Sequence, residues 1–172
     1  MEPLHRYIPN ILSALRIFLI FPFTYSLAYD DMPAVILIVI TMILTDYFDG
    51  YLARKWNVVS DAGKILDPLA DKLCVAAVAL VLVFLRGFPL LLVILLVLRD
   101  VLILIAGFLM LRKDSHVPVS NVLGKVTVGV VAACLLIYLF RLDFLKAPAV
   151  ILTAIMLVVS SVSYWKMFRS TI

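Results

Sequence analysis

The stretch DYFDGYLARKWNVVSDAGKILDPLAD, residues 46–71, carries five aspartates between two segments that are otherwise almost purely apolar. Asp46 and Asp49 are three residues apart, and Asp67 and Asp71 are four residues apart. On helices, both spacings place the two carboxylates of a pair on one face. If the two helices run antiparallel, the two pairs face the same cleft.

Four carboxylates in one cleft repel one another and would not all ionise without cations nearby. Hard divalent cations such as Mg²⁺ take oxygen ligands of this kind and keep coordination positions open for substrate phosphates. Two such ions can serve both the attacking and the leaving oxygens of a phosphoryl-type transfer. The stretch therefore predicts a metal-dependent site for chemistry on phosphate esters.

The composition of the chain is that of a polytopic membrane protein. Of the 172 residues, 65% are hydrophobic and 15% are charged, which is too apolar for a soluble domain. We expect an all-α integral membrane protein in which residues 1–172 form one domain, a six-transmembrane-helix bundle preceded by a short interfacial N-terminal segment. The expected spans cover residues 9–29, 33–54, 63–86, 90–111, 119–140 and 147–165.

The net charge, the two cysteines and the first ten residues give further expectations about binding partners and processing. A formal charge of +4 is modest, and in a membrane protein it indicates orientation and contact with anionic lipids, with no nucleic acid partner. Cys74 and Cys134 lie inside apolar segments and predict small buried side chains, because no disulfide or zinc spacing is visible. No cleavable signal peptide is expected, since the first ten residues are polar and mixed.

Positive charges are distributed unequally between the two sides of this predicted bundle. The less positive side carries Arg86, Arg141 and Lys146. The more positive side should face the cytoplasm, and it is the side that carries the aspartates. Its basic residues are Arg6, Arg54, Lys55, Lys64, Lys72, Arg112, Lys113, Lys166 and Arg169.

The aspartate-rich stretch also resembles a known family. It matches the complete signature of the CDP-alcohol phosphotransferases, Asp46-x-x-Asp49-Gly50-x-x-Ala53-Arg54 followed by Gly63-x-x-x-Asp67-x-x-x-Asp71. The resemblance extends over essentially the full chain, including the Ile8-Pro9-Asn10 opening and the six apolar segments. It implies a CDP-linked lipid substrate, Mg²⁺ or Mn²⁺ as cofactor (two ions), and a homodimer.

Within this resemblance the aspartates take distinct roles. Asp46, Asp49 and Asp67 are the expected metal ligands, because cations must screen the anionic pyrophosphate of the lipid before a nucleophile approaches. By the resemblance, Asp71 is the general base that accepts the proton of the acceptor hydroxyl, while also touching a metal ion. The alternative is that Asp71 is a fourth metal ligand only.

The expected CDP-binding residues lie around the aspartates. Gly50 and Ala53 offer no bulk, so they either let cytidine and ribose approach the helix backbone or let two helices pack closely. Arg16 either snorkels to the membrane interface or lines the nucleotide end of the site, which the resemblance favours. The expected CDP-binding set is Asn10, Asp49, Gly50, Ala53, Arg54 and Gly63.

Three basic residues farther along the chain predict an acceptor site: Arg99, Arg112 and Lys125. Arg99 and Lys125 lie within or at the edge of apolar segments, where an unpaired charge is unfavourable. Arg99 and Asp100 could instead form a self-satisfied structural pair. We favour the interpretation that these cations hold an anionic acceptor.

The acceptor itself follows from local resemblances. The Pro9–Arg16 opening, the tract 66–72 and Gly124-Lys125-Val126 look like bacterial phosphatidylglycerophosphate synthases, which implies transfer of the phosphatidyl group from CDP-diacylglycerol to glycerol 3-phosphate with release of CMP. Those synthases commonly have Arg-Glu where this chain has Arg99-Asp100, and another Arg at Gly107. Arg99-Asp100-Val101 resembles the cardiolipin synthases of the same family, whose acceptor is phosphatidylglycerol.

Two other classes remain open at this stage. A divalent-cation transporter or channel could use intramembrane aspartates, although clustering at one face argues against a permeation path. A non-catalytic assembly protein would have little use for the intact set of four aspartates. The resulting expectation is an integral membrane enzyme of phospholipid biosynthesis in a bacterial inner membrane, with its site facing the cytoplasm.

Overall fold

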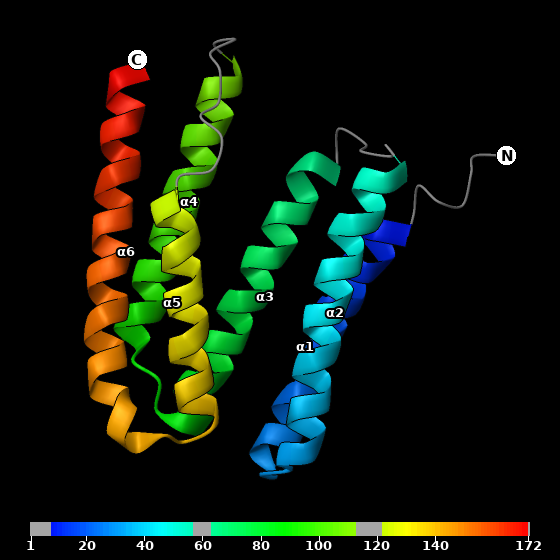
Figure 1. The fold of residues 1–172 in the computed structure, drawn as a ribbon. Helices are drawn as coiled ribbons and strands as arrows, with labels where there is room; N and C mark the ends of the chain where they lie inside the picture. Colours follow the sequence, from blue (N-terminus) through cyan, green and yellow to red (C-terminus); the bar gives the residue numbers. More distant parts are fainter. Residues whose placement is uncertain (1–7, 57–62, 113–121, 172) are drawn as a thin grey trace, which may run out of the picture. The chain divides into compact units, whose positions relative to one another are not determined.

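The structure is a computed structural model that describes the backbone of residues 8–56, 63–112 and 122–171 and the side chains of residues 14–48, 71–105 and 122–166. Within these residues the fold is all-helical, as predicted, and contains no strand. The helices, shown in Figure 1, are α1 (Ile8–Ala28), α2 (Met32–Trp56), α3 (Gly63–Arg86), α4 (Leu90–Arg112), α5 (Val122–Leu139) and α6 (Asp143–Thr171).

The helices divide into two compact units, Met1–Val81 and Leu82–Ile172. The first contains α1, α2 and most of α3, and α1 packs along α2 as an antiparallel pair (Figure 1). Its buried apolar side chains include Phe23 and Leu27 of α1 and Val35 of α2.

Asp30 makes the α1–α2 hairpin tight. It adopts a left-handed backbone conformation with φ of 59°. The amide of Asp31 then donates to the carbonyl of Ser26, and that of Asp30 to the carbonyl of Leu27, which closes the end of α1. The Asp31 carboxylate accepts a hydrogen bond from the amide of Ala34 (3.2 Å) and caps α2. These contacts begin α2 at the predicted place within one residue.

The second unit contains the last turn of α3 and helices α4–α6, with α6 packed against both α4 and α5. Gly87, with φ of +69°, makes the turn between α3 and α4, in the gap between the expected spans 63–86 and 90–111. Arg141 adopts the same left-handed conformation as Asp30, with φ of 54°. The amide of Arg141 donates to the carbonyl of Tyr138, and the amide of Leu142 donates to the carbonyl of Ile137, which closes the end of α5.

The prediction for the last connection was wrong. Residues 141–146 were expected to form a loop, but α6 already begins at Asp143. The left-handed Arg141 completes the reversal in very few residues. Asp143 then favours the helix start as an acid in the first turn, paired with Lys146 at 2.6 Å. Pro148 lies inside the helix without ending it.

The described surface is inverted relative to that of a soluble protein. Large apolar side chains are exposed on all six helices, with Phe84 82% and Phe144 79% exposed, while Arg16 and Arg99 are 5% exposed. By length and composition, two described segments, Val122–Leu139 and Asp143–Lys166, could cross a membrane. The described residues therefore form six helices, while the expectation that all six cross a membrane stays a prediction.

Candidate functional site

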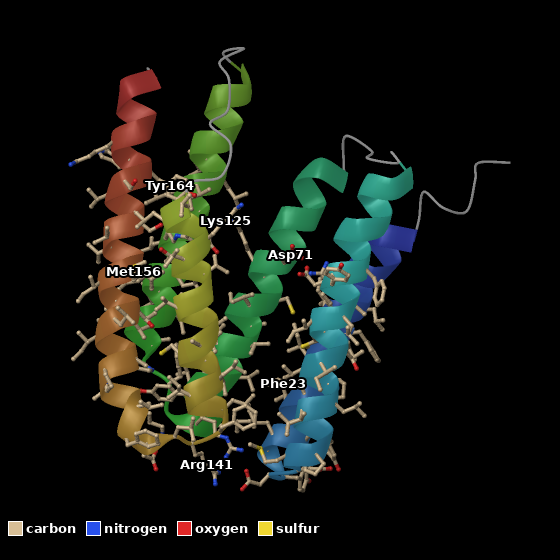
Figure 2. The ribbon with its side chains drawn as sticks, viewed as in Figure 1. Phe23, Asp71, Lys125, Arg141, Met156 and Tyr164 are labelled. Atoms are coloured by element: carbon tan, nitrogen blue, oxygen red, sulfur yellow. The ribbon has the colours of Figure 1, made fainter. Side chains whose placement is uncertain are left out.

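Arg16 joins three helices in the first unit. Its Nη1 atom donates to Oδ1 of Asp46 at 2.6 Å, and the same nitrogen also contacts Oδ1 of Asp71. These carboxylates come from α2 and α3, on either side of a connector in the sequence. Figure 2 shows Asp71 on the side of α3 that faces α1 and α2. Two of the four predicted aspartates therefore converge on one point.

Burial differs sharply across this cluster. The Arg16 side chain is 6% exposed, whereas the side chains of Asp46 and Asp71 are 56% and 45% exposed. The guanidinium group thus lies beneath the carboxylates, and the carboxylates retain an open side. The prediction that Arg16 snorkels to the interface is wrong, because its charged group is directed into the protein. Its role in lining the nucleotide end of the site stays a prediction.

Helix geometry fixes the position of this arginine. Cys74 follows Asp71 by about one turn of α3, and its Sγ atom lies 4.0 Å from the carbonyl oxygen of Arg16. α3 therefore contacts both the backbone and the side chain of Arg16.

The donor set fits a hard divalent cation in its chemistry. Carboxylate oxygens from two helices are the ligands that Mg²⁺ and Mn²⁺ prefer, and here a guanidinium cation stands where those oxygens converge. Among the described side chains, no group of three or more His, Cys, Asp or Glu is arranged around a metal position. The other two predicted ligands, Asp49 and Asp67, have side chains outside that set.

The backbone nevertheless agrees with the predicted helical spacing of Asp49 and Asp67. Asp49 lies within α2 and Asp67 within α3, so the spacings of three and four residues do fall on helices, as expected. Gly63 begins α3, as predicted. The remaining expected CDP-binding side chains lie outside the described set, and the backbone places them in helices: Asn10 in α1, and Gly50, Ala53 and Arg54 in α2.

A second charged cluster lies in the other unit, around Arg99 of α4. Its Nη1 donates to Asp100 at 2.9 Å and its Nε donates to Oγ of Ser160 at 3.2 Å. Its Nη2 lies 3.5 Å from the carbonyl oxygen of Gly124, and its guanidinium carbon lies 5.9 Å from the centroid of the Tyr164 ring. Arg99 therefore joins α4 to α5 and α6, and the alternative of a structural Arg99–Asp100 pair is present.

Lys125 comes directly after the glycine that Arg99 contacts. Its side chain is exposed on α5, and Figure 2 shows Lys125 and Tyr164 toward the same end of α5 and α6. Arg112 is the last residue of α4, and its side chain lies outside the described set. Acceptor binding by Arg99, Arg112 and Lys125 stays a prediction.

Sequence reasoning named Asp100 as a possible partner of Arg99 but missed the distant partners of both buried arginines. An arginine inside an apolar segment signals that a counter-charge must exist. For Arg16 the partners are 30 and 55 residues away in sequence, and for Arg99 the hydroxyl partner is 61 residues away. Helical periodicity identifies a face but not the residue that lies opposite, so Ser160 and Tyr164 gave no signal.

Comparison with known proteins agrees with the aspartate cluster. The profile of the CDP-alcohol phosphatidyltransferase family matches residues 6–165. A CDP-diacylglycerol–glycerol-3-phosphate 3-phosphatidyltransferase of Aquifex aeolicus is 30% identical over 164 residues, covering 91% of each chain. The enzyme of the same name in Mycoplasma pneumoniae is 43% identical over 86 residues, which cover 50% of this chain.

A cardiolipin synthase (CMP-forming) of Streptomyces coelicolor is 33% identical over 125 residues, which cover 69% of this chain. The matched region spans 37% of the Mycoplasma pneumoniae protein and 58% of the Streptomyces coelicolor protein. The family profile, in contrast, runs across both compact units and all six helices. The chain belongs to the CDP-alcohol phosphatidyltransferase family.

Proposed function

We propose that this protein transfers the phosphatidyl group of CDP-diacylglycerol to glycerol 3-phosphate, forming phosphatidylglycerol phosphate and releasing CMP. The observation that carries the proposal is the contact of Asp46 and Asp71 with one nitrogen atom of Arg16. It brings together carboxylates from the two halves of the family signature. The names of the Aquifex and Mycoplasma relatives support glycerol 3-phosphate as the acceptor.

In the proposed reaction Asp71 is the base. The acceptor hydroxyl oxygen forms a bond to the phosphorus of the phosphatidyl group, the bond from that phosphorus to the oxygen of CMP breaks, and the hydroxyl proton passes to the Asp71 carboxylate. The exposed side of Asp71 is the side from which a hydroxyl group can approach. General-base catalysis of this type contributes about 10²–10⁴-fold to the rate.

Family members generally depend on divalent metal ions. We propose that Asp46, Asp49, Asp67 and Asp71 hold two Mg²⁺ or Mn²⁺ ions, which neutralise phosphate charge and polarise the phosphoryl group when bound. Gly50, Ala53, Arg54, Gly63 and Asn10 are assigned to the CDP moiety together with Asp49. Arg99, Arg112 and Lys125 are assigned to the anionic acceptor, Lys125 by direct contact from its exposed position on α5.

We further propose that residues 1–172 form a single domain of six membrane-spanning helices in a bacterial inner membrane. Exposed apolar side chains on every helix support a lipid environment, because contiguous apolar surface of this extent is rare on soluble monomers. The excess of basic residues at the aspartate-bearing ends supports a cytoplasm-facing site. The homodimer rests on the family resemblance.

The second candidate acceptor is phosphatidylglycerol, which would make the protein a cardiolipin synthase. It is favoured by one observation, the 33% identity to the Streptomyces coelicolor cardiolipin synthase over 69% of this chain. The two reactions share the donor and the aspartates, so they differ only in what the basic residues of the second unit hold.

The deciding experiment measures CMP release by purified protein in mixed micelles of CDP-diacylglycerol. Glycerol 3-phosphate should support turnover with Mg²⁺ or Mn²⁺, and a chelator should abolish it. Turnover with phosphatidylglycerol and none with glycerol 3-phosphate would assign the second acceptor. The protein is a transporter if neither acceptor supports CMP release, liposomes containing the wild-type protein take up Mg²⁺, and liposomes containing Asp46→Ala do not.

A further inference from the structure

We infer that Arg16 is the internal counter-cation of the metal-free site, and that it competes with divalent ions for Asp46 and Asp71. The inference rests on the proposed metal site and extends it. It states that Arg16, a residue outside the family signature, controls the affinity of the site for metal ions. The geometry behind it is one buried guanidinium nitrogen in contact with one carboxylate oxygen from each of two helices.

A buried arginine requires charge compensation. The Arg16 side chain is 6% exposed, and a charge so far removed from water is tolerated only when it is paired. Asp46 and Asp71 provide that compensation from α2 and α3. In return, Arg16 reduces the repulsion between two carboxylates that would otherwise drive α2 and α3 apart.

The same contacts set Arg16 against a metal ion. A carboxylate oxygen that accepts a hydrogen bond from guanidinium is a poorer ligand, and a nearby positive charge repels a divalent cation. Asp46 and Asp71 are half exposed on their other side, so an ion can reach them while Arg16 stays buried. Metal affinity should therefore increase when the charge of Arg16 is removed.

The test is Mn²⁺ binding to the detergent-solubilised full chain, followed through the electron paramagnetic resonance signal of free Mn²⁺, with no substrate present. Arg16→Gln should bind Mn²⁺ about tenfold more tightly than the wild-type protein, the effect expected for removing one cation next to a carboxylate. The metal-free variant should melt at a lower temperature, and Mn²⁺ should raise its melting temperature more than that of the wild type.

Two further variants separate charge from burial. Arg16→Lys keeps the positive charge and should bind Mn²⁺ nearly as the wild type does. Arg99→Gln removes an arginine of equal burial from the other unit, so it should lose stability without gaining affinity for Mn²⁺. If Arg16→Gln does not fold without metal, Mn²⁺ during purification should restore the folded state, because the ion supplies the missing charge.

The failures of the two proposals are distinguishable. A wild-type protein that binds Mn²⁺ while Arg16→Gln binds it equally or more weakly overturns the role of Arg16 and leaves the metal site intact. An Arg16→Gln protein that stays unfolded even with Mn²⁺ overturns it as well. A wild-type protein that binds no Mn²⁺ removes the metal site and this inference together.

Discussion

The hydroxyl oxygen of Tyr164 on α6 lies 2.5 Å from the position that a Cβ atom on Gly124 of α5 would occupy. No side chain larger than hydrogen fits there without moving the tyrosine. Arg99 contacts the carbonyl oxygen of the same glycine and lies beside the same ring. Gly124 and Tyr164 thus set how closely α5 and α6 approach next to Lys125.

Gly124→Ala should destabilise the protein by about 1 kcal/mol, because overpacking at such a contact outweighs the better helix propensity of alanine. In a Tyr164→Phe background the same substitution should be neutral or stabilising, since the clashing oxygen is gone and the nearest ring atom lies at 3.4 Å. The measurement is thermal unfolding in detergent, followed by circular dichroism, of the wild type, Gly124→Ala, Tyr164→Phe and the double variant. It compares the effect of Gly124→Ala on stability in the two Tyr164 backgrounds.

Gly129 provides the matched control on the same helix. A Cβ atom there would meet nothing within 4 Å, so Gly129→Ala should stabilise the protein by up to about 1 kcal/mol. An equal effect of Gly124→Ala in both Tyr164 backgrounds would contradict the contact.

Arg99→Lys should lower the free energy of unfolding by about 1–3 kcal/mol, because buried hydrogen-bonding groups are then left unpaired. A lysine ammonium cannot reach Asp100, Ser160 and the Gly124 carbonyl together as the guanidinium group does. Chemical denaturation is the measurement, with Ser160→Ala, which removes one of these partners, as the milder comparison. Unchanged stability in Arg99→Lys would refute the structural role of the cluster.

Lys125→Gln should raise the KM for glycerol 3-phosphate by about 10–100-fold, the loss expected when one charge-assisted hydrogen bond to an anion is removed. The KM for CDP-diacylglycerol and the melting temperature should change little, because the side chain is exposed. Steady-state CMP release at varied acceptor concentration gives both KM values. Lys146→Gln is the control, since Lys146 pairs with Asp143 at the first turn of α6. A KM equal to that of the wild type would show that Lys125 does not hold the acceptor.

Asp71→Asn should reduce turnover by about 10²–10⁴-fold while CDP-diacylglycerol binding is largely retained, because the amide cannot accept the hydroxyl proton. Asp46→Asn should weaken Mn²⁺ binding as well as turnover. The comparison uses CMP release for the rate and equilibrium binding for the donor lipid. Normal turnover by Asp71→Asn would contradict the assignment of Asp71 as the base. If Asp71→Asn loses turnover because it no longer binds the metal ion, Asp71 is a metal ligand only.

Helix positions were largely predictable, because apolar runs bounded by turn residues are local signals. Residues 63–86 were predicted and found as α3, and the turn at Gly87 was found where expected. The error at residues 141–146 has a local cause too. Arg141 takes a left-handed conformation that sequence patterns assign to glycine or asparagine, so the connection was predicted to be longer than it is.

The sequence by itself determined the family and most of the helix positions, because motif spacing and helical periodicity depend only on residues close together in the chain. Only the tertiary structure decided that Arg16 pairs with Asp46 and Asp71, and that Arg99 reaches Ser160 and the Gly124 carbonyl. A buried charge must find a counter-charge, but which distant helix supplies it depends on how the helices pack.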